Sequence, residues 1–204
     1  MKKIIVAAVL VLPGMAYAQQ IPPASPAVVD RVVKESFTKA PEDWVQRLVP
    51  DETMQLCSVT RNQPSAKEAD AIMAREAKTV KLPEGSVIGN WKEGEKVAQN
   101  GRGGQFSDPP GTVSGGNCYA CHQMDPREVS YGTLGPSLTN YGADRKFAPA
   151  DARTTYAKVF NPQVSFACSS MPRFGHNGVL SEQQMKDVVA YLFDPASPVN
   201  KPVK

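Results

Sequence analysis

Two thiols and an imidazole lie close together in the segment Cys118-Tyr-Ala-Cys121-His122. Thiols at this spacing, followed at once by a histidine, form the attachment pattern of a c-type haem. Each thiol would add across one vinyl group of the porphyrin, and His122 would bind the iron as the proximal axial ligand. We therefore predict one covalently bound haem c, attached through Cys118 and Cys121.

Two other kinds of site use the same residue types. A redox-active Cys-x-x-Cys pair usually sits in a strand–helix context, and a zinc site needs a second pair of ligands at similar spacing. The sequence around Cys118 has neither feature. The motif thus favours haem attachment over both alternatives.

The segment Gly135-Pro-Ser-Leu138 could orient the proximal histidine. A metal-bound histidine needs an acceptor for its other ring nitrogen, commonly a backbone carbonyl. The carbonyl of Pro136, roughly 14 residues after His122, could be that acceptor. The same residues could also form an ordinary turn.

The second axial ligand must come from far along the chain to reach the opposite face of the haem. Met124 is too close to the attachment motif, and Met185 shares the inner face of the last predicted helix, which favours a core position. Met171 precedes a proline, so its backbone is restricted to extended conformations that suit an inward-pointing side chain. His176 lies in the same loop and is the main competitor. We predict Met171 as the distal ligand, because a thioether raises the reduction potential and suits an electron acceptor.

The N-terminus predicts export. Lys2 and Lys3 precede nine apolar residues and the small-x-small sequence Ala16-Tyr-Ala18, which is typical of a secretory signal peptide over residues 1–18. The apolar stretch is too short to span a bilayer, and no longer one follows. We expect cleavage after Ala18 and a periplasmic protein without a membrane span.

Charge excludes nucleic acid as a partner. The chain of 204 residues has 23 basic and 20 acidic side chains, and two of the basic ones belong to the predicted signal peptide. No basic stripe remains that could follow a phosphate backbone.

Composition divides the mature chain near residue 88. Residues 19–87 carry no haem signal and predict an N-terminal helical extension with three short helices, the first after Pro26, the second at Pro41 and the third after Ser65. Ser65 and Glu68 form the pattern of a capping box. The plainest role for this extension is to pack against the domain that follows.

Residues 88–204 predict a mono-haem cytochrome c domain. Its first helix starts at Trp91, and its last helix follows Ser181, which with Gln184 forms a second capping box. The first helix crossing the last around a haem gives an all-α, class I cytochrome c fold. Pro195 and Pro198 are expected to end the ordered part of the chain.

Two cysteines remain, Cys57 and Cys168, in a compartment that favours disulfides. A bond between them would join the extension to the haem domain. In the chain-entropy model, closing a loop of this length stabilises the fold by about 4–5 kcal/mol. A free thiol, or Cys168 as a metal ligand near the haem, is the alternative.

Longer segments resemble the SoxX family, the cytochrome subunits of the SoxAX complexes of periplasmic thiosulfate oxidation. The resemblance runs through most of the predicted haem domain. The segments that carry it are Gly103-Gly-Gln-Phe106, Gly115-Gly-Asn-Cys-Tyr-Ala-Cys-His-Gln123, Gly132-Thr-Leu-Gly-Pro-Ser-Leu138 and Met171-Pro-Arg-Phe-Gly-His-Asn-Gly178.

This resemblance implies a specific role. SoxX pairs with SoxA, which carries its own haem and a reactive cysteine, and the complex joins thiosulfate oxidatively to the carrier cysteine of SoxYZ, as an L-cysteine S-thiosulfotransferase. Electrons leave through the SoxX haem to a small cytochrome c. By position, Cys118 and Cys121 would bind the haem, His122 and Met171 would be the axial ligands, and this chain would hold no catalytic residue. Some members have a shorter N-terminal part, so the extension with Cys57 fits a longer type.

Two other functions are compatible with the motif. The chain could be a stand-alone electron-transfer cytochrome that serves another redox enzyme. It could also be a sensor in which Met171 dissociates and admits a gas or sulfur ligand.

Overall fold

The computed structural model describes residues 24–40, 42–105 and 107–201. The predicted signal peptide, its cleavage site after Ala18 and Phe106 of the first SoxX-like segment lie outside these ranges. Every regular element within them is a helix, which confirms the all-α prediction. The chain separates into two compact units, Met1–Val49 and Pro50–Lys204. No helix in the described ranges has the length and hydropathy needed to cross a membrane.

The first unit holds the helix α1 (Pro26–Ser36), the single turn α2 (Glu42–Val45) and the 3-10 turn η1 (Gln46–Leu48). Proline opens α1 because its missing N–H and fixed φ suit the first helical position. The first two helices predicted for the extension are therefore present.

The second unit begins with α3 (Glu52–Val59) and α4 (Ala66–Ala77). The predicted capping box at Ser65 opens α4, with both of its reciprocal hydrogen bonds present. The sequence analysis missed α3, whose N-cap is Asp51: the carboxylate of this residue accepts a 2.8 Å hydrogen bond from the N–H of Met54. Both helices belong to the same compact unit as the predicted haem domain.

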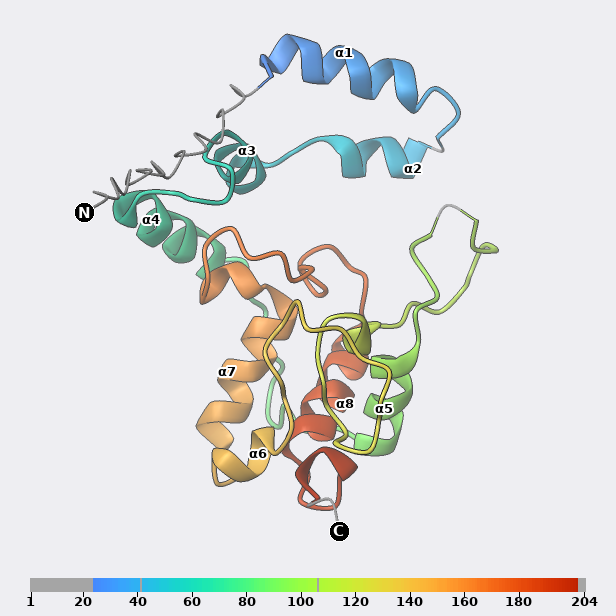
Figure 1. The fold of residues 1–204 in the computed structure, drawn as a ribbon, viewed down its shortest axis with the longest axis vertical. Coiled ribbons are helices and arrows are strands. Elements are labelled where there is room, and N and C mark those ends of the chain that lie inside the picture. The colour runs from blue at the N-terminus through green and yellow to red at the C-terminus, as the bar shows by residue number, and fades with distance from the viewer. Residues whose placement is uncertain (1–23, 41, 106, 202–204) are drawn as a thin grey trace, which may run out of the picture. The chain divides into compact units, whose positions relative to one another are not determined.

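Four further helices follow in the second unit: α5 (Trp91–Gln99), α6 (Tyr141–Asp144), α7 (Pro149–Phe160) and α8 (Glu182–Phe193). The first and last of them pack closely, as predicted (Figure 1). A Cβ at Gly94 of α5 would overlap the backbone carbonyl of Asp187 in α8. The Asp187 carboxylate also accepts a 2.8 Å hydrogen bond from the N–H of Asn90, which fixes where α5 begins against α8.

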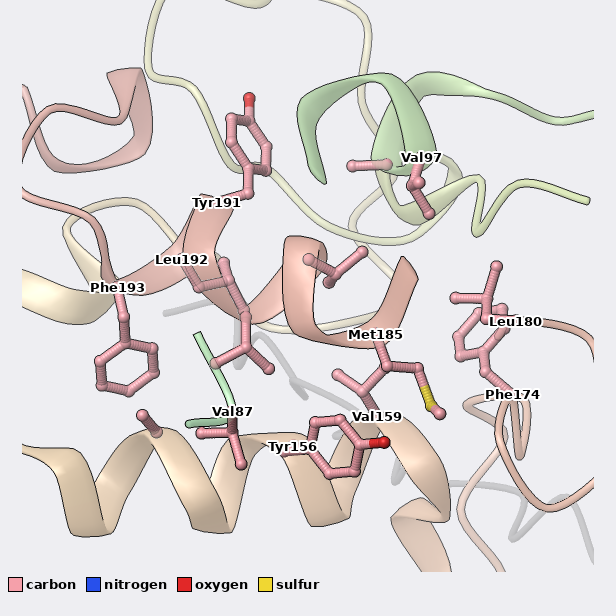
Figure 2. Packing of buried hydrophobic residues seen from close by; sticks show 14 of the residues in the cluster. Val87, Val97, Tyr156, Val159, Phe174, Leu180, Met185, Tyr191, Leu192 and Phe193 are labelled. Atoms are coloured by element: carbon pink, nitrogen blue, oxygen red, sulfur yellow. The ribbon is translucent and has the colours of Figure 1, made fainter. Parts of the chain in front are cut away.

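The core of the second unit lies between α7 and α8 and reaches α5. Figure 2 shows Tyr156 and Val159 of α7 on the side that faces Met185 and Leu192 of α8. Burying these large apolar side chains is the main stabilising contribution to the helix packing. Met185 is buried, as the sequence predicted for a core residue.

The expectation that Pro195 and Pro198 end the ordered part of the chain is wrong. A 3-10 turn, η4 (Pro198–Asn200), continues the chain, and Val199 is 0% exposed. The Val199 carbonyl accepts a 2.8 Å hydrogen bond from the N–H of Asn140. Prolines end a helix because they lack an N–H, but they do not prevent the next segment from packing.

Candidate functional site

A tight turn brings together three of the four predicted haem-binding residues, Cys118, Cys121 and His122. The 3-10 turn η2 (Cys118–Ala120) follows Asn117, whose φ of 46° is in the left-handed region that asparagine tolerates. The carbonyl of Cys118 then accepts hydrogen bonds from the N–H groups of Cys121 and His122, at 3.1 and 2.9 Å. Neither Cys118 nor Cys121 is in a disulfide. Two unpaired thiols and an imidazole therefore project from one turn.

A hydrogen bond to the backbone fixes the ring of His122. Its Nδ1 lies 2.7 Å from the carbonyl oxygen of Pro136, the acceptor that the sequence suggested. A carbonyl can only accept, so Nδ1 carries the proton and Nε2 keeps its lone pair. A Cβ at Gly135 would overlap the ring, so only glycine lets the backbone approach this closely. His122 thus presents one free nitrogen with the basicity and fixed orientation of a metal ligand.

The segment behind His122 is aligned with the attachment turn by its backbone. Three hydrogen bonds of 2.7–2.8 Å join the two stretches: Gly132 N–H to Tyr119 O, Gly135 N–H to Cys121 O, and Leu138 N–H to Gln123 O. We call residues 117–138 the attachment loop. Its Leu134 is 78% exposed beside Gly135, and large apolar side chains in this position are the kind that an apolar macrocycle packs against.

The pKa of the Cys118 thiol does not suit a redox pair. Burial raises the pKa of the Cys118 thiol to about 12, and the neighbouring Cys121 adds to the rise. A catalytic Cys-x-x-Cys pair depends on the opposite shift, a lowered pKa that supplies thiolate. The donor set fits a thioether-bound haem with one imidazole ligand.

Comparison with known proteins decides the family. Residues 91–194 match the model of the cytochrome c family. The chain belongs to the cytochrome c family. It is also 35% identical over 193 residues to a protein of Aquifex aeolicus (strain VF5) named "Uncharacterized lipoprotein", with 88% of this chain and 91% of that protein covered. This coverage is too large to lie within residues 91–194, so the similarity extends into other parts of the chain.

Membership accounts for the fold and the cofactor class. Proteins of the cytochrome c family carry covalently bound haem c and transfer electrons, and the packing of α5 on α8 is that of a class I cytochrome c. The class I prediction is confirmed.

A pair of tyrosines supports the attachment loop of this cytochrome, and the sequence analysis did not identify it. The hydroxyl of Tyr119, inside the haem motif, lies 2.8 Å from that of Tyr191 on α8, and it accepts a 3.0 Å hydrogen bond from the N–H of Asp125. Burial raises the pKa of both phenols, so both stay neutral. The variable positions of a Cys-x-x-Cys-His motif carry no signal for this contact.

Met124, Met171 and Met185 differ in how deeply they are buried. Met124 is 1% exposed and lies with Met185 inside the hydrophobic core. Met171 is half-buried, and with Cys118 it borders the same core cluster. Met185 lies in α8, whereas Met124 and Met171 both lie in segments without regular secondary structure, and of these two only Met171 is partly exposed.

We call residues 168–178 the distal loop. Cys168 at its start forms a disulfide with Cys57 of α3. Burial raises the pKa of Asp51, but hydrogen bonds from the Met54 N–H and from Arg173 lower it further than burial raises it, and His176, the competing ligand, makes a small contribution in the same direction, so it lies near the carboxylate that caps α3.

Proposed function

We propose that this cytochrome is a single-haem electron relay with His122 and Met171 as axial ligands. The observation that carries the proposal is the His122 imidazole, which is fixed by Pro136 with its Nε2 free and stands directly beside two unpaired thiols. Cys118 and Cys121 anchor the cofactor through thioethers, and the attachment loop keeps the imidazole in one orientation. A haem c bound there supplies a one-electron couple. With both axial positions taken by side chains, the protein offers substrate no open site.

We further propose that the relay serves a SoxAX-type complex in the periplasm, behind a signal peptide cleaved after Ala18. The support is the resemblance of the attachment loop and of residues 171–178 to the SoxX family. In that complex the chain pairs with a SoxA-type cytochrome subunit, which holds the catalytic cysteine. Thiosulfate is joined to the carrier cysteine of SoxYZ, and a small cytochrome c takes the electrons. This chain is then the electron-transfer subunit of a heteromeric L-cysteine S-thiosulfotransferase.

Affinity capture from cells grown on thiosulfate tests this role. The tagged chain is recovered from the periplasmic fraction under gentle conditions, and the eluate is analysed by mass spectrometry and by haem reduction after thiosulfate and SoxYZ are added. A stoichiometric haem-bearing partner, with reduction only in the complex, is the expected result. A variant with Cys118→Ser and Cys121→Ser is the matched control, and its own haem signal should be absent.

Recovery of a lone monomer, with a haem that thiosulfate does not reduce in any fraction, would remove the SoxAX proposal. A stand-alone electron carrier for another redox enzyme would then remain. A haem whose distal ligand is displaced by small sulfur compounds at low concentration would instead indicate a sensor.

A further inference from the structure

A buried cluster of charges lies beside the distal loop. Arg173, two residues after Met171, is almost fully buried. Its Nη2 lies 2.6 Å from Oδ2 of Asp51, at the start of α3, and its Nη1 lies 3.5 Å from Oε2 of Glu76, near the end of α4. One guanidinium therefore bridges two carboxylates that come from a distant part of the sequence.

The carboxylate of Glu76 is held on both oxygens. Oε1 accepts a hydrogen bond from the Thr53 hydroxyl, and Oε2 accepts a 2.7 Å bond from the side-chain amide of Asn161. A buried carboxylate with this many donors has little freedom to turn. The acceptor that Arg173 meets is thus fixed in position by α3 and by the end of α7.

The distal loop depends on such tethers, because residues 165–180 contain only turns and bends. At its start, the disulfide to Cys57 fixes Cys168. Next, the N–H of Met171 donates a 3.2 Å hydrogen bond to the Ser169 hydroxyl, while the Ser169 carbonyl accepts one from Gln163. The ion pairs of Arg173 hold the loop on the other side of Met171.

We infer that Arg173 is a positioning residue: its pairing with Asp51 and Glu76 holds the distal loop in the conformation that presents Met171 to the haem iron. This inference rests on the proposed function, in which Met171 is the distal ligand. A short stiff link joins the two side chains, because Pro172 has a fixed φ and restricts the residue before it.

The charge cluster contributes more to the orientation of the distal loop than to the stability of the fold. A buried ion pair adds little net stability, because the cost of removing the charges from water offsets their attraction. A guanidinium fork does impose orientation, since its donors meet carboxylates only in the guanidinium plane. A loop without regular structure gains a defined position from such a contact.

Competition by imidazole measures how firmly Met171 is held. In the purified ferric haem protein, imidazole binds only when the methionine leaves the iron, so its apparent dissociation constant reports the fraction of iron that is free. Arg173→Met and Glu76→Gln should each bind imidazole about tenfold more tightly than the unmodified protein. The weak long-wavelength absorption of the methionine–iron bond should fall in parallel.

Two further variants distinguish the geometry of the Arg173 ion pairs from a general effect of charge. Glu52→Gln removes an ion pair between Glu52 of α3 and Arg75 of α4, and the Glu52 side chain, which has no ion pair with Arg173, is 76% exposed. It should change the imidazole constant by no more than about twofold, as expected for a surface pair. Arg173→Lys keeps the charge without the fork and should lie between the unmodified protein and Arg173→Met.

A lower unfolding temperature in Arg173→Met, with an unchanged imidazole constant and absorption, would overturn the inference and leave Arg173 a purely structural role. Should Arg173→Met not fold, Glu76→Gln and Asp51→Asn decide the question in the same assay, because each keeps the arginine and removes one carboxylate. Met171→Ala distinguishes the two proposals. Loss of the methionine absorption in that variant supports the ligand assignment, whereas an unchanged spectrum overturns the assignment and the inference together.

Discussion

The attachment loop and the distal loop are positioned in opposite ways. In the attachment loop, the contact that orients His122 comes from a residue 14 positions away, and three further backbone hydrogen bonds lie within the same loop, which the Tyr119–Tyr191 contact ties to α8. In the distal loop, two long-range contacts come from residues 97 and 111 positions away, through the ion pair of Arg173 with Glu76 and the disulfide of Cys168 with Cys57. The orientation of His122 is thus set within its own loop, whereas the distal loop is tied to α3 and α4.

This difference separates two tasks of the proposed site, attaching the haem and holding its distal ligand. The attachment loop orients His122 through its own backbone, although Tyr119 also contacts α8. The distal loop, in contrast, is tied to α3 and α4 by its disulfide and by the ion pairs of Arg173. Changes in the first region should therefore affect whether haem is held, and changes in the second should affect how firmly its distal ligand is held.

The largest effect is expected when the two proposed axial ligands are removed in turn. His122→Ala should reduce the yield of folded, haem-loaded protein by more than about tenfold, because the ligand that the attachment loop presents is lost. Met171→Ala should keep covalent haem at nearly full yield. Haem staining on denaturing gels, with the polypeptide quantified in parallel, measures both. Equal losses in the two variants would contradict the division between the loops.

Removing the disulfide should have the next largest effect. A variant with Cys57→Ser and Cys168→Ser should lose about 2–5 kcal/mol of unfolding free energy, because the bond closes a long loop in the unfolded chain. Chemical denaturation followed by circular dichroism measures the change. Covalent haem content should stay unchanged. A haem-deficient product would show that the attachment loop also depends on α3.

A methyl group added next to the His122 imidazole tests how tightly the attachment loop packs against it. Gly135→Ala places a Cβ against the His122 ring and should cost about 1–3 kcal/mol of unfolding free energy, as overpacking does. Gly101→Ala is the matched control, because its nearest atoms would lie 3.4 Å away, in ordinary contact. Thermal unfolding of the haem-loaded proteins compares them, and equal midpoints would show that the approach to His122 is not tight.

The smallest effect is expected on the loss of stability at acid pH when Asp51 is replaced. Burial raises the pKa of Asp51, but hydrogen bonds from the Met54 N–H and from Arg173 outweigh it and leave the pKa below the ordinary 3.8. Such a group stabilises the folded state above pH 3.8, and this contribution is lost as the pH falls through the folded-state pKa. Asp51→Asn should therefore reduce the acid-dependent loss of stability by less than about 1 kcal/mol, since the side chain is 41% exposed and solvent screens its charge. Unfolding titrations between neutral and acid pH measure it, and an unchanged acid slope would contradict the assignment.

The same division explains what the sequence could predict. The attachment turn, the acceptor for His122 and the two capping boxes are short-range patterns, and the structure contains all of them. Each depends on residue types at fixed spacing, which a reader of the sequence can recognise.

The missed elements depend on long-range contacts or on weak patterns. The side chains that α7 buries include small and polar ones, Ala152 and Thr155, so its apolar periodicity is faint although Pro149 marks its start. The eight-residue α3 does not gather its apolar residues on one face, and it is held by the disulfide and by the cluster around Glu76. Arg173 stands in a segment that the sequence analysis singled out, but nothing local indicates that its partners lie in α3 and α4.

Covalent attachment through both cysteines of the attachment loop is tested most directly by mass spectrometry of the purified protein. The intact mass should equal that of the mature chain, less two hydrogens for the Cys57–Cys168 disulfide, plus one whole haem, because thiols add across vinyl groups without loss of hydrogen. After proteolysis, the haem should remain on the peptide that contains Cys118 and Cys121, even after extraction with acidified organic solvent. Free, alkylatable thiols at these two positions, or a disulfide between them, would contradict the account.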